Sequence, residues 1–248
     1  YYPQPSVAGT SDGGNNLPLE NWPQRISYHT ELYRFDHNFS VNNRMFVRVN
    51  NWTRTSIGSD WFGLDNPALG AYFIQDQAGF TIDDVHVFSP TMVMNWKISE
   101  TRFVRAQDAT DPGINFDVTS LGLPAYLRDA QADAYRRFPS VLIGGYTSLG
   151  PRTPLHRPAE VRQGLVAFDK ISGQHTVKFG GEYRAYLENQ RAGTVTTSSQ
   201  LSFSDAYTRG PLDTSAAAPR GQALASMMMG VLSGGGFLVP ADYAEKSS

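Results

Sequence analysis

The chain has 248 residues, a formal net charge of -2 and no cysteine. Disulfides, thiolate catalysis and Cys-ligated metals are therefore excluded, and the lack of a basic excess argues against a nucleic-acid partner. Aromatic residues make up 12% of the chain beside 23 Gly, a composition typical of strands and turns.

No apolar run approaches the roughly 18 residues of a transmembrane helix. A membrane β-barrel is still compatible with this hydropathy, because its apolar face occupies alternate residues. Residues 1–23 are rich in Pro, Gly, Asn and Ser and predict a loop. The N-terminus has neither an initiator Met nor a signal segment, and DYAEKSS adds no closing element at the other end, so we expect both ends to be cuts within a longer chain.

Period-two alternation predicts a first hairpin from Arg25–His37 and the segment NNRMFVRVNNW, with a turn over residues 38–43. Residues 56–79 contain Gly, Asp, Asn and Pro without a sustained period, and we expect a long loop there. The segment DDVHVFSPTMVMNWKIS predicts a second hairpin that turns at Ser89–Thr91. The first two residues of this segment, Asp83 and Asp84, are adjacent and should therefore point to opposite faces of a strand.

A second long connection is expected over residues 105–139, with a short helix around 124–135 and a returning strand at 141–149. The third hairpin joins 160–174 to 174–189, where Gly173 suits a tight turn. A third long loop, 190–220, contains a short strand at 200–204. A helix at 223–230 follows, and we expect Gly234–Gly236 to terminate it.

The arm from Gln174 to Asn189 alternates without interruption and exceeds the usual strand of about five or six residues. Short turns near residues 40, 90 and 172 also alternate with long irregular connections, as expected of an outer-membrane barrel. We therefore predict an all-β fold, namely a segment of an antiparallel up-and-down transmembrane β-barrel. This partial barrel should carry long extracellular loops and one or two short helices.

Four segments together resemble the barrel of TonB-dependent receptors of the Oar-like subgroup: DHNFSVNNRMFVRVN, HVFSPTMVMNWKIS, SGQHTVKFGGEYR and ALASMMMG. The resemblance implies that residues 1–248 are part of one barrel domain, without the plug or the TonB box. It implies a bacterial outer-membrane protein whose complete form binds a ligand and takes it up with energy from the TonB complex. The expected partners are outer-membrane lipid, that complex and a small ligand, which is an oligosaccharide, a peptide or a metal chelate.

Two groups of side chains are candidates for ligand contact. Polar residues on one strand parity are expected to face the barrel lumen, mainly as inter-strand pairs; they are Lys178, Glu182, Arg184, Asn95, Lys97 and Arg48. Aromatic residues in the first long loop are expected to contribute to ligand capture; they are Trp61, Phe62 and Tyr72. Aromatic girdles at the membrane boundaries are expected to include Trp52, Trp96, Phe179 and Tyr183.

No catalytic or metal-binding constellation stands out. The five histidines lack metal-site spacing, and Asp108, Asp111 and Gly113 match a calcium loop only in part. Ser226 lacks a nucleophile-elbow pattern. We therefore expect no enzyme activity, no cofactor and no metal. The alternatives to a transporter are a soluble carbohydrate-binding β-sandwich and a surface adhesin, with a secreted hydrolase as the weakest.

Overall fold

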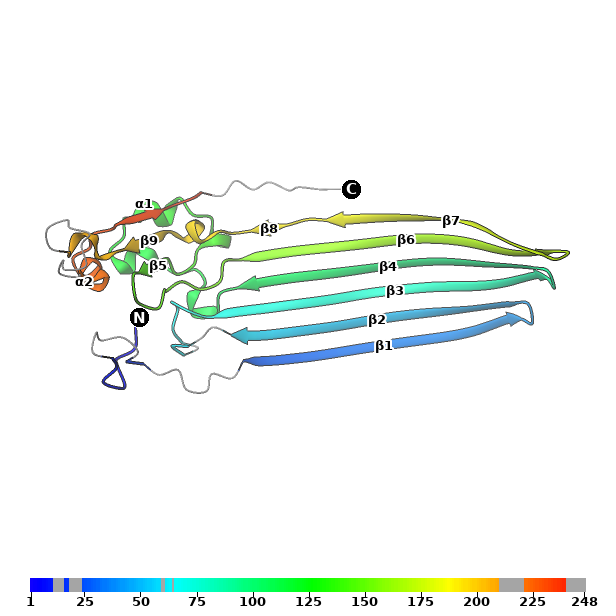
Figure 1. Cartoon of the computed structure of the whole chain (residues 1–248), viewed down its shortest axis with the longest axis horizontal. Helices are drawn as coiled ribbons and strands as arrows, with labels where there is room; N and C mark the ends of the chain where they lie inside the picture. Colours follow the sequence, from blue (N-terminus) through cyan, green and yellow to red (C-terminus); the bar gives the residue numbers. More distant parts are fainter. Residues whose placement is uncertain (11–15, 18–23, 59–60, 64, 210–220, 240–248) are drawn as a thin grey trace.

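The computed structural model describes residues 1–10, 16–17, 24–58, 61–63, 65–209 and 221–239. A seven-stranded antiparallel sheet dominates the chain, in the order β1-β2-β3-β4-β6-β7, with β8 also paired to β6. Figure 1 shows the long strands side by side, with the irregular segments gathered at one end. Because β1 and β7 are edge strands, the sheet is open. The predicted fold, an all-β partial barrel with neighbouring strands paired in sequence order, is confirmed.

The long strands have between 14 and 19 residues each. They are β1 (Arg25–Ser40), β2 (Asn43–Gly58), β3 (Ala71–Ser89), β4 (Met92–Asp108), β6 (Leu155–Ser172) and β7 (His175–Glu188). No helix among the described residues is long and apolar enough to cross a membrane.

Three two-residue turns join the long strands at one end of the sheet, at residues 41–42, 90–91 and 173–174. Gly173 has a φ of 60°, a conformation that glycine adopts without steric cost. The register shifts beside the first two turns, between Asn38 and Ser40 and between Val87 and Ser89. The predicted positions of all three hairpin turns are confirmed.

The strand register divides the side chains between two faces. Residues paired across antiparallel strands point to the same side, and successive residues alternate. What we call the polar face consists of the even-numbered residues of β1, β2 and β7 and the odd-numbered residues of β3, β4 and β6. The other side is the apolar face, which near the turns contains Phe35, Met45, Val47, Val49, Ile82, Met94, Trp96, Ile98, Val166, Phe168, Val177, Phe179 and Tyr183.

The apolar stretch ends at a cluster of four charged residues on the same face, Glu100, Arg102, Glu160 and Arg162. Arg162 is within 3.0 Å of Glu160 and 3.6 Å of Glu100, and Arg102 within 3.8 Å of Glu160. On β4, this cluster begins directly after Ile98. Beyond it the strands continue with mixed polar and apolar residues on both faces.

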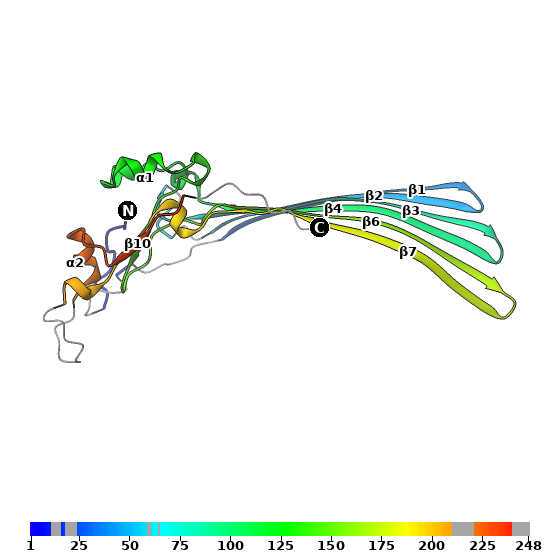
Figure 2. The same cartoon turned by 90° about the horizontal axis from the view of Figure 1, so that it is seen from above.

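The segments at the far end from the turns fold into a loop cluster, which Figure 2 shows beyond the long strands. A small sheet in the order β10-β9-β5 lies in it, formed by Gly234–Gly236, Gln200–Phe203 and Ser140–Ile143. Its buried core contains Ala68, Phe138, Val141, Ile143, Leu149, Phe203 and Ala223. The remaining elements are α1 (Ala125–Asp129), α2 (Ala223–Met228), β8 (Arg191–Ala192) and the short helices η1 (Asp111–Gly113), η2 (Val118–Leu121), η3 (Asp133–Tyr135), η4 (Val195–Ser198) and η5 (Asp205–Tyr207).

Two of the predicted loops are too long. The loop predicted at 56–79 is wrong for half of its length, because β2 continues to Gly58 and β3 begins at Ala71. The loop predicted at 105–139 begins only after Asp108. In both segments the hydrogen bonds between strands continue past the point where the period-two alternation of the sequence fades. The strands are therefore longer than the alternating segments that predict them.

The smaller elements were predicted with mixed success. The strand at 200–204 and the helix at 223–230 are confirmed as β9 and α2, whereas the helix at 124–135 is only the short α1 followed by η3. The returning strand predicted at 141–149 is too long, because only β5 (Ser140–Ile143) is a strand there, and it pairs with β9 in the small sheet. Gly234–Gly236 form β10 and do not terminate α2. Residues 210–220 of the last predicted loop lie outside the described residues.

Candidate functional site

All six of the polar candidates lie on the polar face. Lys178, Glu182 and Arg184 are on β7, Asn95 and Lys97 on β4, and Arg48 on β2. They do not form one site, because β3 separates Arg48 from the β4 pair and β6 separates the β7 group from it. The polar face is therefore a wall with several separate polar clusters.

One cluster forms around Asp83 of β3. Asn95 donates a hydrogen bond from Nδ2 to Oδ1 of Asp83, at 2.8 Å, and Nζ of Lys97 lies 3.3 Å from Oδ2. The adjacent carboxylate, Asp84, accepts a hydrogen bond from Asn43 on the apolar face instead. The prediction that these two aspartates point to opposite faces is confirmed.

A second cluster covers β6 and β7. Lys178 lies 2.9 Å from Asp169, and Arg184 lies 2.5 Å from Glu182, which also accepts a hydrogen bond from Gln163 at 3.1 Å. These side chains are exposed to solvent, where an ion pair contributes about 0–1 kcal/mol. Their main effect is to give a water-facing surface in which the opposite charges of neighbouring strands balance.

The three loop aromatics do not form a common surface. Trp61 is 39% exposed, whereas Phe62 packs against the core of the loop cluster and against Tyr2, with ring centroids 5.6 Å apart. Tyr72 belongs to β3 and lines a cavity on the apolar face of the sheet. The placement of Tyr72 in the first long loop is wrong, because β3 begins at Ala71. The contribution of these three residues to ligand capture stays a prediction.

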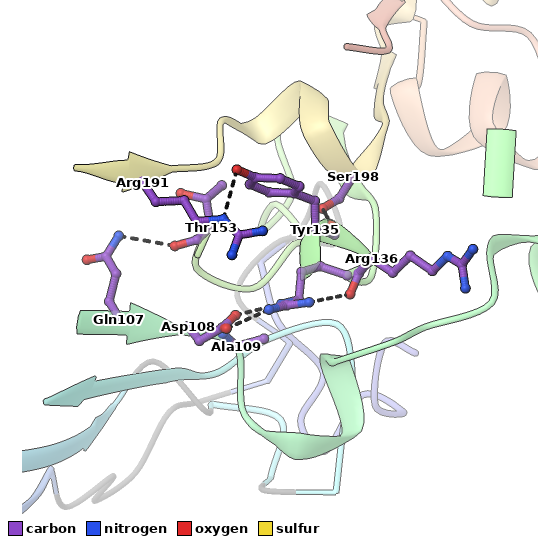
Figure 3. Close-up of polar contacts among 9 residues, drawn as sticks. Gln107, Asp108, Ala109, Tyr135, Arg136, Thr153, Arg191 and Ser198 are labelled. Carbon is purple, nitrogen blue, oxygen red and sulfur yellow. Dashed lines mark hydrogen bonds and ion pairs between the residues drawn. The ribbon is translucent and has the colours of Figure 1, made fainter. Parts of the chain in front are cut away.

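That cavity has a volume of about 320 Å³ and lies between the loop ends of β3, β4 and β6 and the segment that contains Tyr135. Figure 3 shows the polar contacts that fix this segment. Arg191 donates a hydrogen bond from Nε to the hydroxyl of Tyr135 at 3.2 Å, and Ser198 donates one to the Tyr135 carbonyl at 3.0 Å. Gln107 donates to the carbonyl of Thr153 at 3.3 Å. These contacts tie three separate loops to the strand ends.

Trp52 is on the polar face and not in an apolar girdle. Its Nε1 donates a hydrogen bond to Gln77 at 2.6 Å, and its ring centroid lies 6.0 Å from that of Phe103. The girdle prediction is therefore wrong for Trp52, because the register puts even-numbered β2 residues on the polar side. Trp96, Phe179 and Tyr183 are on the apolar face.

Several charged groups of the loop cluster have shifted pKa values. Hydrogen bonds from Thr119 hold the pKa of Asp117 below its usual range, and a hydrogen bond from Arg209 lowers that of Asp205. Burial, with the nearby phenol of Tyr146, raises the pKa of Tyr2 to about 12. These shifts arise from structural contacts, and the described residues contain no cluster of three or more His, Asp or Glu that could hold a metal ion.

Sequence reasoning missed Gln75, Gln77 and Phe73 of the polar face, because they lie in the segment predicted as a loop. A weak signal was present, since Phe73, Gln75 and Gln77 share one parity. The opposite parity, however, mixes Tyr72 and Ile74 with Asp76 and gave no clear contrast.

Long strands, a water-facing side and an exposed apolar side together define a wall that separates water from lipid. A family model described as an outer membrane beta barrel domain matches residues 1–247. The chain belongs to this family, and its location is the bacterial outer membrane. No curated protein and no solved structure matches the chain.

In outer-membrane barrels generally, the apolar face of the strands is the outer one. The sandwich alternative does not fit, because a sandwich buries its apolar face against a second sheet. Here Tyr183, Phe179 and Val177 are 75%, 52% and 50% exposed on that face, and the small second sheet lies in the loop cluster beyond the strands.

Proposed function

We propose that this chain is part of a TonB-dependent receptor of the Oar-like kind, which binds a ligand at the cell surface and takes it up with energy from the TonB complex. The plug and the TonB box would come from parts of the protein beyond these residues. The proposed ligand is small, and the proposal includes no catalytic step and no nucleic-acid partner.

The observation that carries this proposal is the contrast between the two ends of the sheet. Two-residue turns close one end, whereas the other end carries a folded loop cluster with its own buried core. Outer-membrane barrels have short periplasmic turns and longer extracellular loops. The loop cluster then faces the outside, where ligand capture takes place.

The two faces of the sheet support the same arrangement. The polar face is lined by paired charges and amides, as expected of a water-filled or plugged interior, while the apolar face meets lipid. A sheet with open edges at β1 and β7 also requires further strands to complete a barrel.

The orientation can be tested with single cysteines, because the chain has none of its own. We expect a membrane-impermeant maleimide added to whole cells to label Ser148→Cys in the loop cluster and not Asn42→Cys in the first turn. Both variants should react equally after the outer membrane is opened. Labelling of Asn42→Cys in intact cells would reverse the orientation and refute capture by the loop cluster.

Energy coupling needs a separate test with the complete protein. We expect the full-length protein, purified in detergent, to bind the periplasmic domain of TonB and to lose this binding when the TonB box is deleted. Failure to bind TonB, with the maleimide pattern as expected, would instead favour the adhesin alternative, in which the same loops attach to a surface without import.

A further inference from the structure

The positive charges of the polar face outnumber the negative ones. Each carboxylate on this face has a cationic partner: Asp36 with Arg34, Asp83 with Lys97, Asp169 with Lys178, Glu182 with Arg184, and Glu188 with Arg157. Four arginines of the same face have no ion pair among the described residues, and these are Arg44, Arg48, Arg54 and Arg105. The middle of the wall, β2 to β4, therefore carries an excess of positive charge.

Two of these arginines flank one residue in the same row of the sheet. Arg54 of β2 and Arg105 of β4 are both paired in register with Gln75 of β3. Strands lie about 4.8 Å apart, so the two Cα atoms are roughly 10 Å apart and both long side chains can reach the space above Gln75. Arg54 donates a hydrogen bond from Nη1 to Oε1 of Gln75 at 3.1 Å, which holds it toward that space.

In the next row of paired residues toward the turns, two aromatic side chains flank a glutamine in the same way. Trp52 and Phe103 flank Gln77, and their rings are 6.0 Å apart between centroids. Each aromatic residue lies two positions before an arginine on the same strand, so an apolar surface borders the two guanidinium groups on one side.

A cavity of about 200 Å³ lies over the arginine row, lined by Arg54, Gln75, Arg105, Phe73, Ser56 and Gln24. The guanidinium of a third arginine, Arg152, lies 5.7 Å from the centre of the Phe73 ring at the edge of this cavity. The volume is below the 300–1,000 Å³ usual for a drug-sized ligand and suits one small chemical group.

We propose that this cavity binds an organic anion. The carboxylate or phosphate group is held between Arg54 and Arg105, and a planar or apolar body rests against Trp52 and Phe103. Guanidinium groups bind both kinds of oxyanion with two parallel hydrogen bonds, and an anion here compensates two neighbouring positive charges that have no acidic partner. Aromatic rings add a preference for a ligand with a flat face.

This inference deepens the proposed function, since it names a ligand class. It rests on the proposed function in one respect, namely that the polar face lines the interior of the barrel. It does not require energy-coupled uptake. Binding measured in detergent without TonB therefore tests the anion site, and TonB binding tests the transporter, so that either can fail without the other.

The experiment is calorimetric titration of the complete protein in detergent with phenyl phosphate, benzoate and inorganic phosphate. We expect phenyl phosphate to bind more tightly than inorganic phosphate, and the double variant R54Q/R105Q to weaken binding of all the anions at least tenfold. The matched control, K178Q/R184Q, removes the same charge from β7 on the same face, outside the arginine row, and should change affinity less than threefold. Trp52→Leu should weaken phenyl phosphate and leave inorganic phosphate unchanged.

Equal loss in R54Q/R105Q and K178Q/R184Q would overturn the site, because general charge would then explain the binding. Equal affinity for phenyl phosphate and inorganic phosphate would overturn the role of the aromatic row. Should the double variant fail to fold, Arg105→Gln decides the question, because Arg105 makes no ion pair among the described residues. Unchanged affinity in that single variant would refute the proposal.

Discussion

Arg137 holds the carboxylate of Asp108 with two parallel hydrogen bonds, from Nε to Oδ1 and from Nη2 to Oδ2, each 2.5 Å long. Arg137 is only 5% exposed, and Asp108 is the last residue of β4. The pair therefore ties the loop cluster to the end of a long strand, and Figure 3 labels Asp108 at this strand end.

Replacing Arg137 by Ala leaves the Asp108 carboxylate without its partner. We expect a loss of about 2–3 kcal/mol in the stability of the loop cluster, as for other hydrogen bonds to a charged group. The neighbouring Arg136 pairs with Asp133, whose side chain is 83% exposed, so Arg136→Ala should cost no more than about 1 kcal/mol. The measurement is the urea midpoint at which proteinase K cleaves between residues 109 and 139. Equal midpoints in the two variants would contradict the tethering role.

Gly180 of β7 lies against the backbone of β6. A Cβ at this position would clash with the carbonyl oxygen of Val166 and come within 2.8 Å of Cα of Ala167, whereas one at Gly181 would meet nothing within 4 Å. We expect Gly180→Ala to destabilise the barrel by about 1–3 kcal/mol and Gly181→Ala to change stability by less than about 0.5 kcal/mol. Thermal unfolding of the purified protein measures both. The register through this glycine pair is continuous, without a β-bulge.

Depth in the membrane should decide the effect of a charge on the apolar face. Val166 pairs with Trp96 in the middle of the apolar stretch, whereas Val177 pairs with Lys170 beside the turn. We expect Val166→Arg to cost about 2–4 kcal/mol and Val177→Arg about 0–1 kcal/mol. Urea titration of folding into lipid vesicles gives both values. Similar costs at the two positions would mean that the apolar stretch does not follow the bilayer.

Tyr2 should report on the docking of the N-terminal segment at high pH. Its hydroxyl donates a hydrogen bond to the carbonyl of Thr147, and burial raises its pKa to about 12 from 10.0. Because the folded state favours the neutral phenol, this contribution to stability is complete below pH 10 and is lost as the pH rises from 10 through 12. Absorbance titration of the native protein and of Tyr2→Phe should differ by one phenol that ionises near pH 12. A difference centred near pH 10 would show that Tyr2 is not docked.

The sequence predicts best where the two faces of a strand meet different surroundings. Val177, Phe179 and Tyr183 contrast with Lys178 and Glu182, so alternation identified β7, and its register places the two groups on opposite faces. Beyond the charged cluster the contrast fades. The sequence therefore predicts a loop over Tyr72 to Gln77, although their backbone continues the ladder.

The loop cluster depends on contacts between distant parts of the chain. β5 pairs in parallel with β9, as in Ser140 with Gln200, and no local pattern encodes a pairing across so many residues. The same applies to the candidate anion site. Arg54 and Arg105 lie on either side of Gln75 in the sheet. The sequence predicts Gln75 to be in a loop and therefore does not predict that the two arginines lie close together.

The charged cluster of Glu100, Arg102, Glu160 and Arg162 marks the edge of the apolar stretch on the side of the loop cluster. Above it β4 continues from Glu100 to Asp108, which is roughly 25 Å of strand or about 20 Å of height in a tilted barrel. In the orientation proposed above, these strand ends raise the loop cluster above the lipid headgroups. Particles too large to approach the bilayer itself, such as antibodies or phage tail fibres, would therefore meet the loop cluster first.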